Sequence, residues 1–196
     1  IIFSILSIIP SNWNESIKNT FIDLQFKIRG NRQLSDELAI VFIGDEDIKA
    51  LDAQNAWPIT RDYYGYLIYI LNQLGAKVIG IDVLFETADR NYPEYDNVLA
   101  EILRDSKNVC LPMTFAELTF DQKDRGKFSP RLQTGHIPTF PLNKFQDQSA
   151  GLGFSNFDQE RIIRKVPIAV AIDDSFMLSF GCELARLYLN GTESIK

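Results

Sequence analysis

Histidine is scarce in this sequence, which has His136 and no other in 196 residues. A zinc site of two histidines, or of histidine and cysteine at the usual spacing, therefore cannot be assembled. No nucleophile motif lies near His136, and the sequence has no P-loop, G-x-S-x-G elbow or G-x-G-x-x-G turn. Asp45-Glu46-Asp47 fails as a calcium loop, because Ala50 stands where an EF-hand requires glycine. We expect no metal and no cofactor.

Basic residues are fewer than acidic residues in this sequence. The chain has 20 Lys and Arg against 26 Asp and Glu, a formal net charge of -6, and the basic residues form no cluster. A nucleic-acid partner needs a basic surface that neutralises phosphates, and an anionic membrane surface attracts basic segments. Both are therefore disfavoured as partners.

Cysteine occurs twice, as Cys110 in a predicted strand and Cys182 in a predicted helix. Free cysteine packs as a small apolar residue, so we favour two buried, reduced thiols. A disulfide is the alternative and would suit an oxidising compartment, but the sequence does not place the two sulfur atoms together. Cysteine usage therefore leaves the compartment open.

The apolar run at residues 1–10 is too short to cross a bilayer, because a spanning helix needs about 20 apolar residues. It also lacks the basic flank of a signal peptide. The run is either the outer end of a truncated transmembrane helix or an apolar element of the core.

The clearest helical pattern follows Trp57-Pro58, a dipeptide that favours a turn. Thr60 is placed to cap a helix, and Asp62 suits the positive end of its dipole. Gly75 stands where a left-handed C-cap is needed. The predicted buried face of this helix is one apolar stripe at helical spacing: Tyr63, Leu67, Ile70, Leu71 and Leu74.

An apolar strand is predicted over residues 78–85, with Asp82 inside it, and it is apolar enough to be covered on both faces. Other elements are predicted from periodicity and caps. The predicted helices cover residues 11–28, 46–51, 93–108 and 175–190, and the predicted strands cover 38–43, 109–115, 150–157 and 164–172, the last pairing back on 150–157 as a hairpin. Residues 117–145 are predicted to be a long surface excursion.

This order of elements predicts a single three-layer α/β domain. Its central sheet is mixed but mostly parallel, with helices on both faces. A β-hairpin and a C-terminal helix close the domain, and an N-terminal juxtamembrane helix precedes it. The exposed face of helix 11–28 is a candidate dimer contact, and packing on its own domain is the alternative.

Two acidic residues, Asp45 and Asp82, lie near the carboxyl ends of strands predicted to be parallel, where open α/β sheets place ligands. A carboxylate beside an apolar strand needs a partner, and Arg61 is an available cation. These residues form either a network that fixes the turn at Trp57-Pro58 or part of a ligand crevice. Trp57 is correspondingly either a wall of that crevice or a core plug.

Several short motifs follow one another along the chain. They are Gly44-Asp45, Trp57-Pro58-Ile59-Thr60-Arg61, Gly75-Ala76-Lys77-Val78-Ile79, Ile81-Asp82, and Asn156 and Asp158 followed by Ile163-Arg164-Lys165-Val166-Pro167. The ordered set resembles the CHASE2 domain, an extracytoplasmic sensor module of bacterial membrane receptors, over residues 23–189. The chain departs from the family pattern at Gly44, where isoleucine is usual, and at Glu160-Arg161, which replaces Asp-Gly.

The resemblance implies a non-enzymatic sensory domain at residues 11–196, preceded at 1–10 by the outer end of a transmembrane helix. It implies an unknown small-molecule or environmental stimulus, a membrane tether and a homodimer. It also implies a cytoplasmic output domain outside this chain, such as a histidine kinase or nucleotide cyclase. The candidate ligand-binding residues are Asp45, Trp57, Arg61, Asp82, Asn156 and Arg164. The alternatives are a small α/β hydrolase or phosphatase using Asp45 and Asp82, and a dimerisation module without a ligand.

Overall fold

The structure, a computed structural model, describes residues 11–33, 35–50, 58–120, 132–156, 163–164 and 166–190. The chain divides into two compact units, one formed by Ile1–Ile43 with Asp158–Lys165 and the other by Gly44–Phe157 with Val166–Lys196. The predicted membrane end at residues 1–10 lies outside the described residues.

The first unit contains α2 (Ser11–Arg29), which confirms the helix predicted over residues 11–28. The strand predicted over residues 38–43 is wrong: this segment has no strand geometry, and its apolar side chains are exposed. An apolar run becomes a strand only when a neighbouring strand satisfies its backbone groups, and the described residues of the first unit include no strand.

The second unit begins with α3 (Asp45–Ala50), α4 (Arg61–Gln73), β1 (Ile79–Gly80), α5 (Pro93–Ser106) and β2 (Val109–Thr119). Gly75 adopts the predicted left-handed φ, 88°, after α4. Thr60 stands at the predicted N-cap position with extended backbone, but its side chain makes no capping hydrogen bond. The strand predicted over 78–85 is much shorter than expected, and Asp82 lies beyond its end.

The rest of the unit contains β3 (Gln133–Thr139), α6 (Asn143–Gln146), β4 (Gly151–Phe154), β5 (Ala169–Ile172), β6 (Ser175–Leu178) and α7 (Phe180–Asn190). The surface excursion predicted over 117–145 is therefore wrong, because β2 continues into it and β3 returns antiparallel to β2. The helix predicted from Ser175 begins instead at Phe180, after β6 has paired with β5. The predicted hairpin partner of 150–157 is also wrong, since β5 pairs with β3 and β6.

The sheet has six strands in the order β1-β2-β3-β5-β6, with β4 also paired to β2. The first half of β2 lies between the parallel strands β1 and β4, in registers such as Ile79↔Val109 and Cys110↔Gly151. Its second half pairs with β3. This mixed sheet confirms the predicted α/β class.

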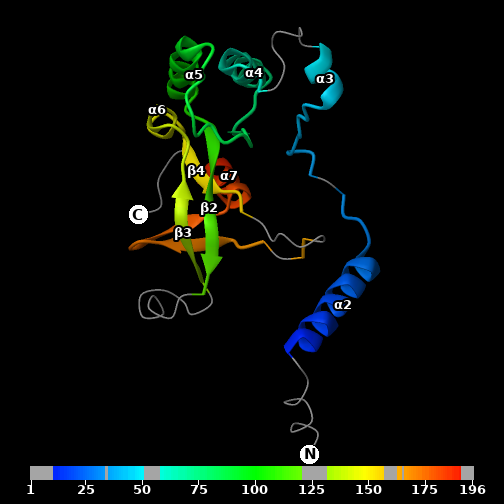
Figure 1. The fold of residues 1–196 in the computed structure, drawn as a ribbon. Coiled ribbons are helices and arrows are strands. Elements are labelled where there is room, and N and C mark those ends of the chain that lie inside the picture. The colour runs from blue at the N-terminus through cyan, green and yellow to red at the C-terminus, as the bar shows by residue number, and fades with distance from the viewer. Residues whose placement is uncertain are drawn as a thin grey trace, which may run out of the picture. The chain divides into compact units, whose positions relative to one another are not determined.

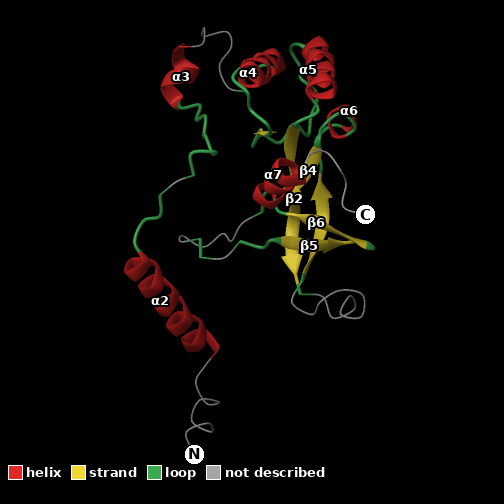
Figure 2. Cartoon of the chain, turned by 180° about the vertical axis from the view of Figure 1, so that it is seen from behind, coloured by secondary structure: helices red, strands yellow, loops and turns green. Residues whose placement is uncertain are grey.

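Helices cover both faces of the sheet around β2. The main core joins α4, α5 and α6 to one face, through residues such as Ile68, Leu103 and Val109. On the other face, a Cβ added at Gly153 would lie 2.6 Å from the Phe180 Cα atom, so glycine lets α7 lie directly on β4. Accordingly, α7 lies behind β2 in Figure 1 and in front of it in Figure 2.

The buried face of α4 differs from the predicted one. Tyr64, Gly65 and Ile68 are buried, whereas Tyr63 and Leu74 of the predicted stripe are exposed. Apolar residues surround most of this helix, so two stripes overlap, and packing against α5 decides which of them is buried.

Candidate functional site

Arg61 links three parts of the second unit at the start of α4. Its Nε atom lies 3.4 Å from Oδ1 of Asp96 on α5, and its NH2 group donates a 3.0 Å hydrogen bond to the carbonyl oxygen of Thr87. The guanidinium also lies over the Phe85 ring, 4.8 Å from its centroid. Arg61 therefore holds α4, α5 and the segment after β1 together.

Asp96 is the buried counter-charge of this cluster, with a side chain only 1% exposed. Its Oδ2 accepts a 3.1 Å hydrogen bond from the backbone N–H of Asp89. Arg61 Nε and Asp96 Oδ1 face each other without hydrogen-bond geometry, so that contact is Coulombic. Removing one member of a buried pair leaves an uncompensated charge and strongly destabilises a protein. The Arg61–Asp96 pair is therefore a structural element of the fold.

The carboxyl ends of α4 and α5 are tied by amide and hydroxyl groups. Asn72 donates a 3.3 Å hydrogen bond from Nδ2 to Oγ of Ser106. Asn108 donates to Oδ1 of Asn72 at 2.8 Å and to the carbonyl oxygen of Ala76 at 3.1 Å. The two helices are thus fixed to each other at both ends.

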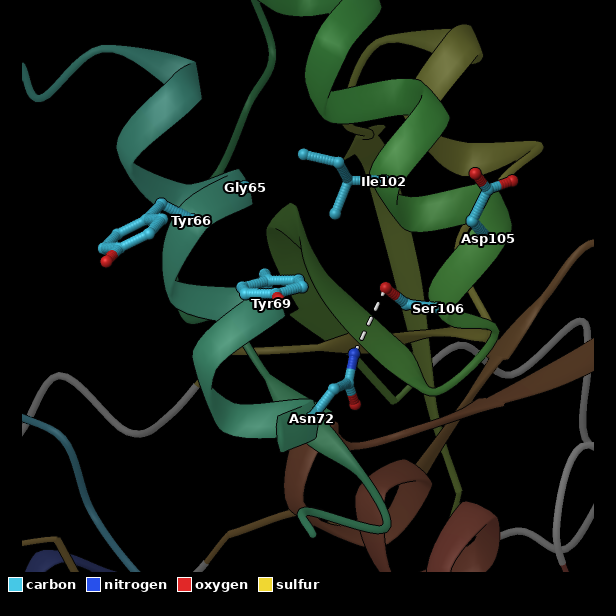
Figure 3. Close-up of a pocket in the computed structure, with 7 residues that line it drawn as sticks. All are labelled: Gly65, Tyr66, Tyr69, Asn72, Ile102, Asp105 and Ser106. Carbon is cyan, nitrogen blue, oxygen red and sulfur yellow. Dashed lines mark hydrogen bonds between the residues drawn. The ribbon is translucent and has the colours of Figure 1, made fainter. Parts of the chain in front are cut away.

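Between these ties, a surface groove of about 550 Å³ runs along α4 and α5. Figure 3 shows its lining, which is Gly65, Tyr66, Tyr69 and Asn72 from α4 and Ile102, Asp105 and Ser106 from α5. The helices approach closely at Gly65, where an added Cβ would lie 2.5 Å from Cδ1 of Ile102.

The groove combines apolar and polar contacts. The rings of Tyr66 and Tyr69 are exposed and offer apolar faces with hydroxyl tips. Asp105 supplies a carboxylate, paired at the surface with Arg104 at 3.0 Å. Surface pairs of this kind are weak, so a cationic ligand group can compete for that carboxylate.

The structure does not bring together the acidic residues and the arginine that the sequence suggested as one site. Asp45 begins α3 and is exposed, and Asp82 is exposed after β1. Within the described residues, Arg61 makes its ion pair with Asp96 and not with either of them. Trp57 lies outside the described residues, as does Asp158.

Two further candidates have partners inside the chain. The side-chain amide of Asn156 pairs with the backbone of β2 as a neighbouring strand would. It accepts a hydrogen bond from the Phe115 N–H and donates one to the Phe115 carbonyl oxygen, both at 2.7 Å. Arg164 makes two hydrogen bonds of 2.8 and 2.9 Å to the Asp23 carboxylate. The ligand-binding role of all six candidates stays a prediction.

The sequence reasoning missed Asp96 and the groove. A signal for Asp96 was present, since it shares a helical stripe with Leu99 and Leu103 and an acid on such a stripe requires a buried partner. The signal for the groove was the series of tyrosines on α4, but which of them point outward depends on the contact with α5.

The described part of the chain shows no metal-binding cluster and a buried thiol at Cys110. Among the described residues, no three His, Cys, Asp or Glu side chains are grouped to hold a metal ion. Both cysteines are free. Burial raises the pKa of Cys110 to about 12, chiefly by desolvation, with the charge of Glu183 adding to the rise and that of Arg186 opposing it. Cys110 therefore remains a protonated thiol at neutral pH.

Comparison with known proteins returned one kind of match. A family model described as the CHASE2 domain matches residues 1–196. No curated protein and no solved structure matches the chain. Within the described part of the chain, none of the helices combines the length and apolar character that crossing a membrane requires.

Proposed function

The chain belongs to the CHASE2 domain family, whose members are sensory domains, and on this basis we propose that it senses a stimulus outside the cytoplasm for a bacterial transmembrane receptor. The response passes to a cytoplasmic output domain, a kinase or a nucleotide cyclase, that is not part of this sequence. The observation that carries the proposal is the family match over residues 1–196.

The α4–α5 groove is the proposed contact for the stimulus. Its two tyrosine rings and the carboxylate of Asp105 suit a small molecule with an aromatic ring and a cationic amine. Such a molecule signals only if it binds one arrangement of the protein better than another. Because Arg61–Asp96 and Asn72–Ser106 tie the helices at both ends, a ligand between them would change how α4 and α5 pack rather than separate them.

The receptor role is tested in the parent protein. We expect long apolar spans on both sides of this sequence, and a reporter enzyme that is active only outside the cytoplasm should be active when fused within residues 166–190. A parent sequence without any membrane-spanning segment, or a reporter that is active only on the cytoplasmic side, would contradict the proposed location.

The groove is tested on the purified chain with tyramine and tryptamine as probes. Binding to the folded state raises the melting temperature, and we expect Tyr69→Ala to remove that rise. Tyr63→Ala is the matched control, because Tyr63 is an exposed tyrosine of α4 outside the groove. In the parent receptor, Tyr66→Ala with Tyr69→Ala should change the output. An unchanged output with intact folding would reject the groove but not the sensory role.

A further inference from the structure

Arg164 and Asp23 are joined by two hydrogen bonds within the first unit. The guanidinium donates from Nε to Oδ1 of Asp23 at 2.8 Å and from its NH2 group to Oδ2 at 2.9 Å. Two parallel hydrogen bonds between opposite charges fix orientation as well as distance, and they are stronger than bonds between neutral groups. The pair therefore sets where Arg164 lies along α2, although Asp23 is 141 positions away in the sequence.

The chain is held to the sheet soon after Arg164. Four residues later, the carbonyl oxygen of Ile168 accepts a 2.8 Å hydrogen bond from the N–H of Ser179, immediately before α7. β5 begins at the next residue, Ala169. Because four residues of chain reach at most about 14 Å when fully extended, β5 cannot shift far without drawing Arg164 along.

The chain is also held to the sheet before Arg164. β4 ends at Phe154, and the side-chain amide of Asn156 makes two 2.7 Å hydrogen bonds to the backbone of Phe115 in β2. Arg164 thus lies between two points of attachment, at Asn156 and Ile168. A stretch of chain that is attached at both ends has less conformational freedom to lose when it binds α2.

We propose that the Arg164–Asp23 pair is the link through which a change in the sheet reaches α2. The inference rests on the proposed receptor role, because α2 adjoins residues 1–10, the predicted outer end of a transmembrane helix. Arg164 is then a positioning residue of the sensor rather than a contact for the stimulus. Coupling between distant parts of a protein needs such a physical connection between them.

The first test asks whether a change in the sheet reaches α2 through this pair. In the purified full chain, Asn156→Ala releases the stretch before Arg164 at one end, so the pair has more chain to order and α2 opens more often. We expect amide hydrogen exchange of α2 to accelerate at least about twofold, the lower end of coupling within one network. With Arg164→Gln already in place, the same substitution should have no further effect.

The matched control is Asn72→Ala, which removes amide hydrogen bonds between α4 and α5 and should leave exchange of α2 unchanged. Exchange of α5 checks that the second unit of the Asn156→Ala chain is folded, and Asn156→Ser takes its place if it is not. An acceleration that persists with Arg164→Gln would overturn the proposal. So would an equal acceleration from Asn72→Ala, or exchange of α2 that does not respond at Asn156.

The second test measures the resting output of the parent receptor. Asp23→Asn and Arg164→Gln should each change it at least about twofold, and the double substitution should change it no further, because each removes the same pair. Lys27→Gln, a loss of charge on the same helix, should leave the output unchanged. An output that neither single substitution changes contradicts the proposal. Additive effects contradict it too, since Arg164 would then act apart from Asp23, as a direct contact for the stimulus would. A parent protein that is not a receptor would reject the proposed function, whereas the exchange test would still decide whether the pair couples the sheet to α2.

Discussion

The helix pair α4–α5 and the helix α2 carry the same kind of apolar stripe, but among the described residues the stripe of α4–α5 is the one packed into a core cluster. In α4–α5 the stripe is buried against a partner helix and the sheet, and Arg61–Asp96 adds a buried ion pair. In α2 the stripe consists of Ile17, Phe21, Leu24 and Ile28, which belong to neither of the core clusters of the described residues. The ion pair Arg164–Asp23 lies on the other side of this helix, with the Asp23 side chain 37% exposed.

The difference shows that an amphipathic pattern does not identify what covers it. Two features of α4–α5 fix an internal partner: Gly65, which admits Ile102, and Asp96, an acid that needs a buried cation. On its apolar side, α2 has neither a close-approach glycine nor a buried charge among its described side chains.

Asp96→Ala should produce the largest effect, because it leaves Arg61 buried without a counter-charge. We expect the free energy of unfolding to fall by about 3–5 kcal/mol, measured by urea denaturation at pH 7. Replacing both residues by leucine should recover part of this loss. The control is Asp105→Ala, which breaks an exposed pair with Arg104 and should cost below about 1 kcal/mol. Equal costs for the two alanine variants would mean that the buried pair does not hold α4 to α5.

Gly65→Ala should have an intermediate effect, since the added Cβ would lie 2.5 Å from Ile102 Cδ1. Overpacking costs about 1–3 kcal/mol, and the better helix propensity of alanine returns up to about 1 kcal/mol, so the free energy of unfolding should fall. With Ile102→Val, which removes Cδ1, the same substitution should become neutral or stabilising. Gly181→Ala is the control, because nothing lies within 4 Å of its added Cβ. If Gly65→Ala lowers the free energy of unfolding equally with and without Ile102→Val, the strain does not come from contact with Ile102.

The sequence predicted those parts of the fold that depend on local signals. The extents of α2, α4 and α5 follow from caps and periodicity, and Pro93 begins α5 as expected. The core strand β2 was also predicted at its start, Val109. These signals act within a few residues, so they can be read without knowing the neighbours.

The wrong predictions concern pairing between distant segments. β3 resembles a loop because it contains Gly135 and Pro138, yet a Cβ at Gly135 would lie 2.5 Å from the Phe115 ring. Glycine is therefore required by the facing strand, which the local sequence cannot show. Likewise, Arg61 was identified as a cation needing an acid, but its partner lies on α5, 35 positions along the chain at Asp96, and not at Asp45 or Asp82.

The smallest effect is expected on α2, at the ion pair between Asp23 and Arg164. Hydrogen bonds from Arg164, and then its charge, hold the pKa of the Asp23 carboxyl below its ordinary value of 3.8 against the opposing effect of desolvation. A lowered pKa in the folded state means that the stabilising contribution is present above pH 3.8 and is lost as the pH falls through the folded pKa. A carboxyl ¹³C NMR titration should therefore give a midpoint below 3.8 for Asp23. Arg164→Gln should raise that midpoint more than Lys27→Gln, because Lys27 contributes the weakest of the named interactions. If Arg164→Gln leaves the midpoint unchanged, the ion pair between Arg164 and Asp23 does not form in solution.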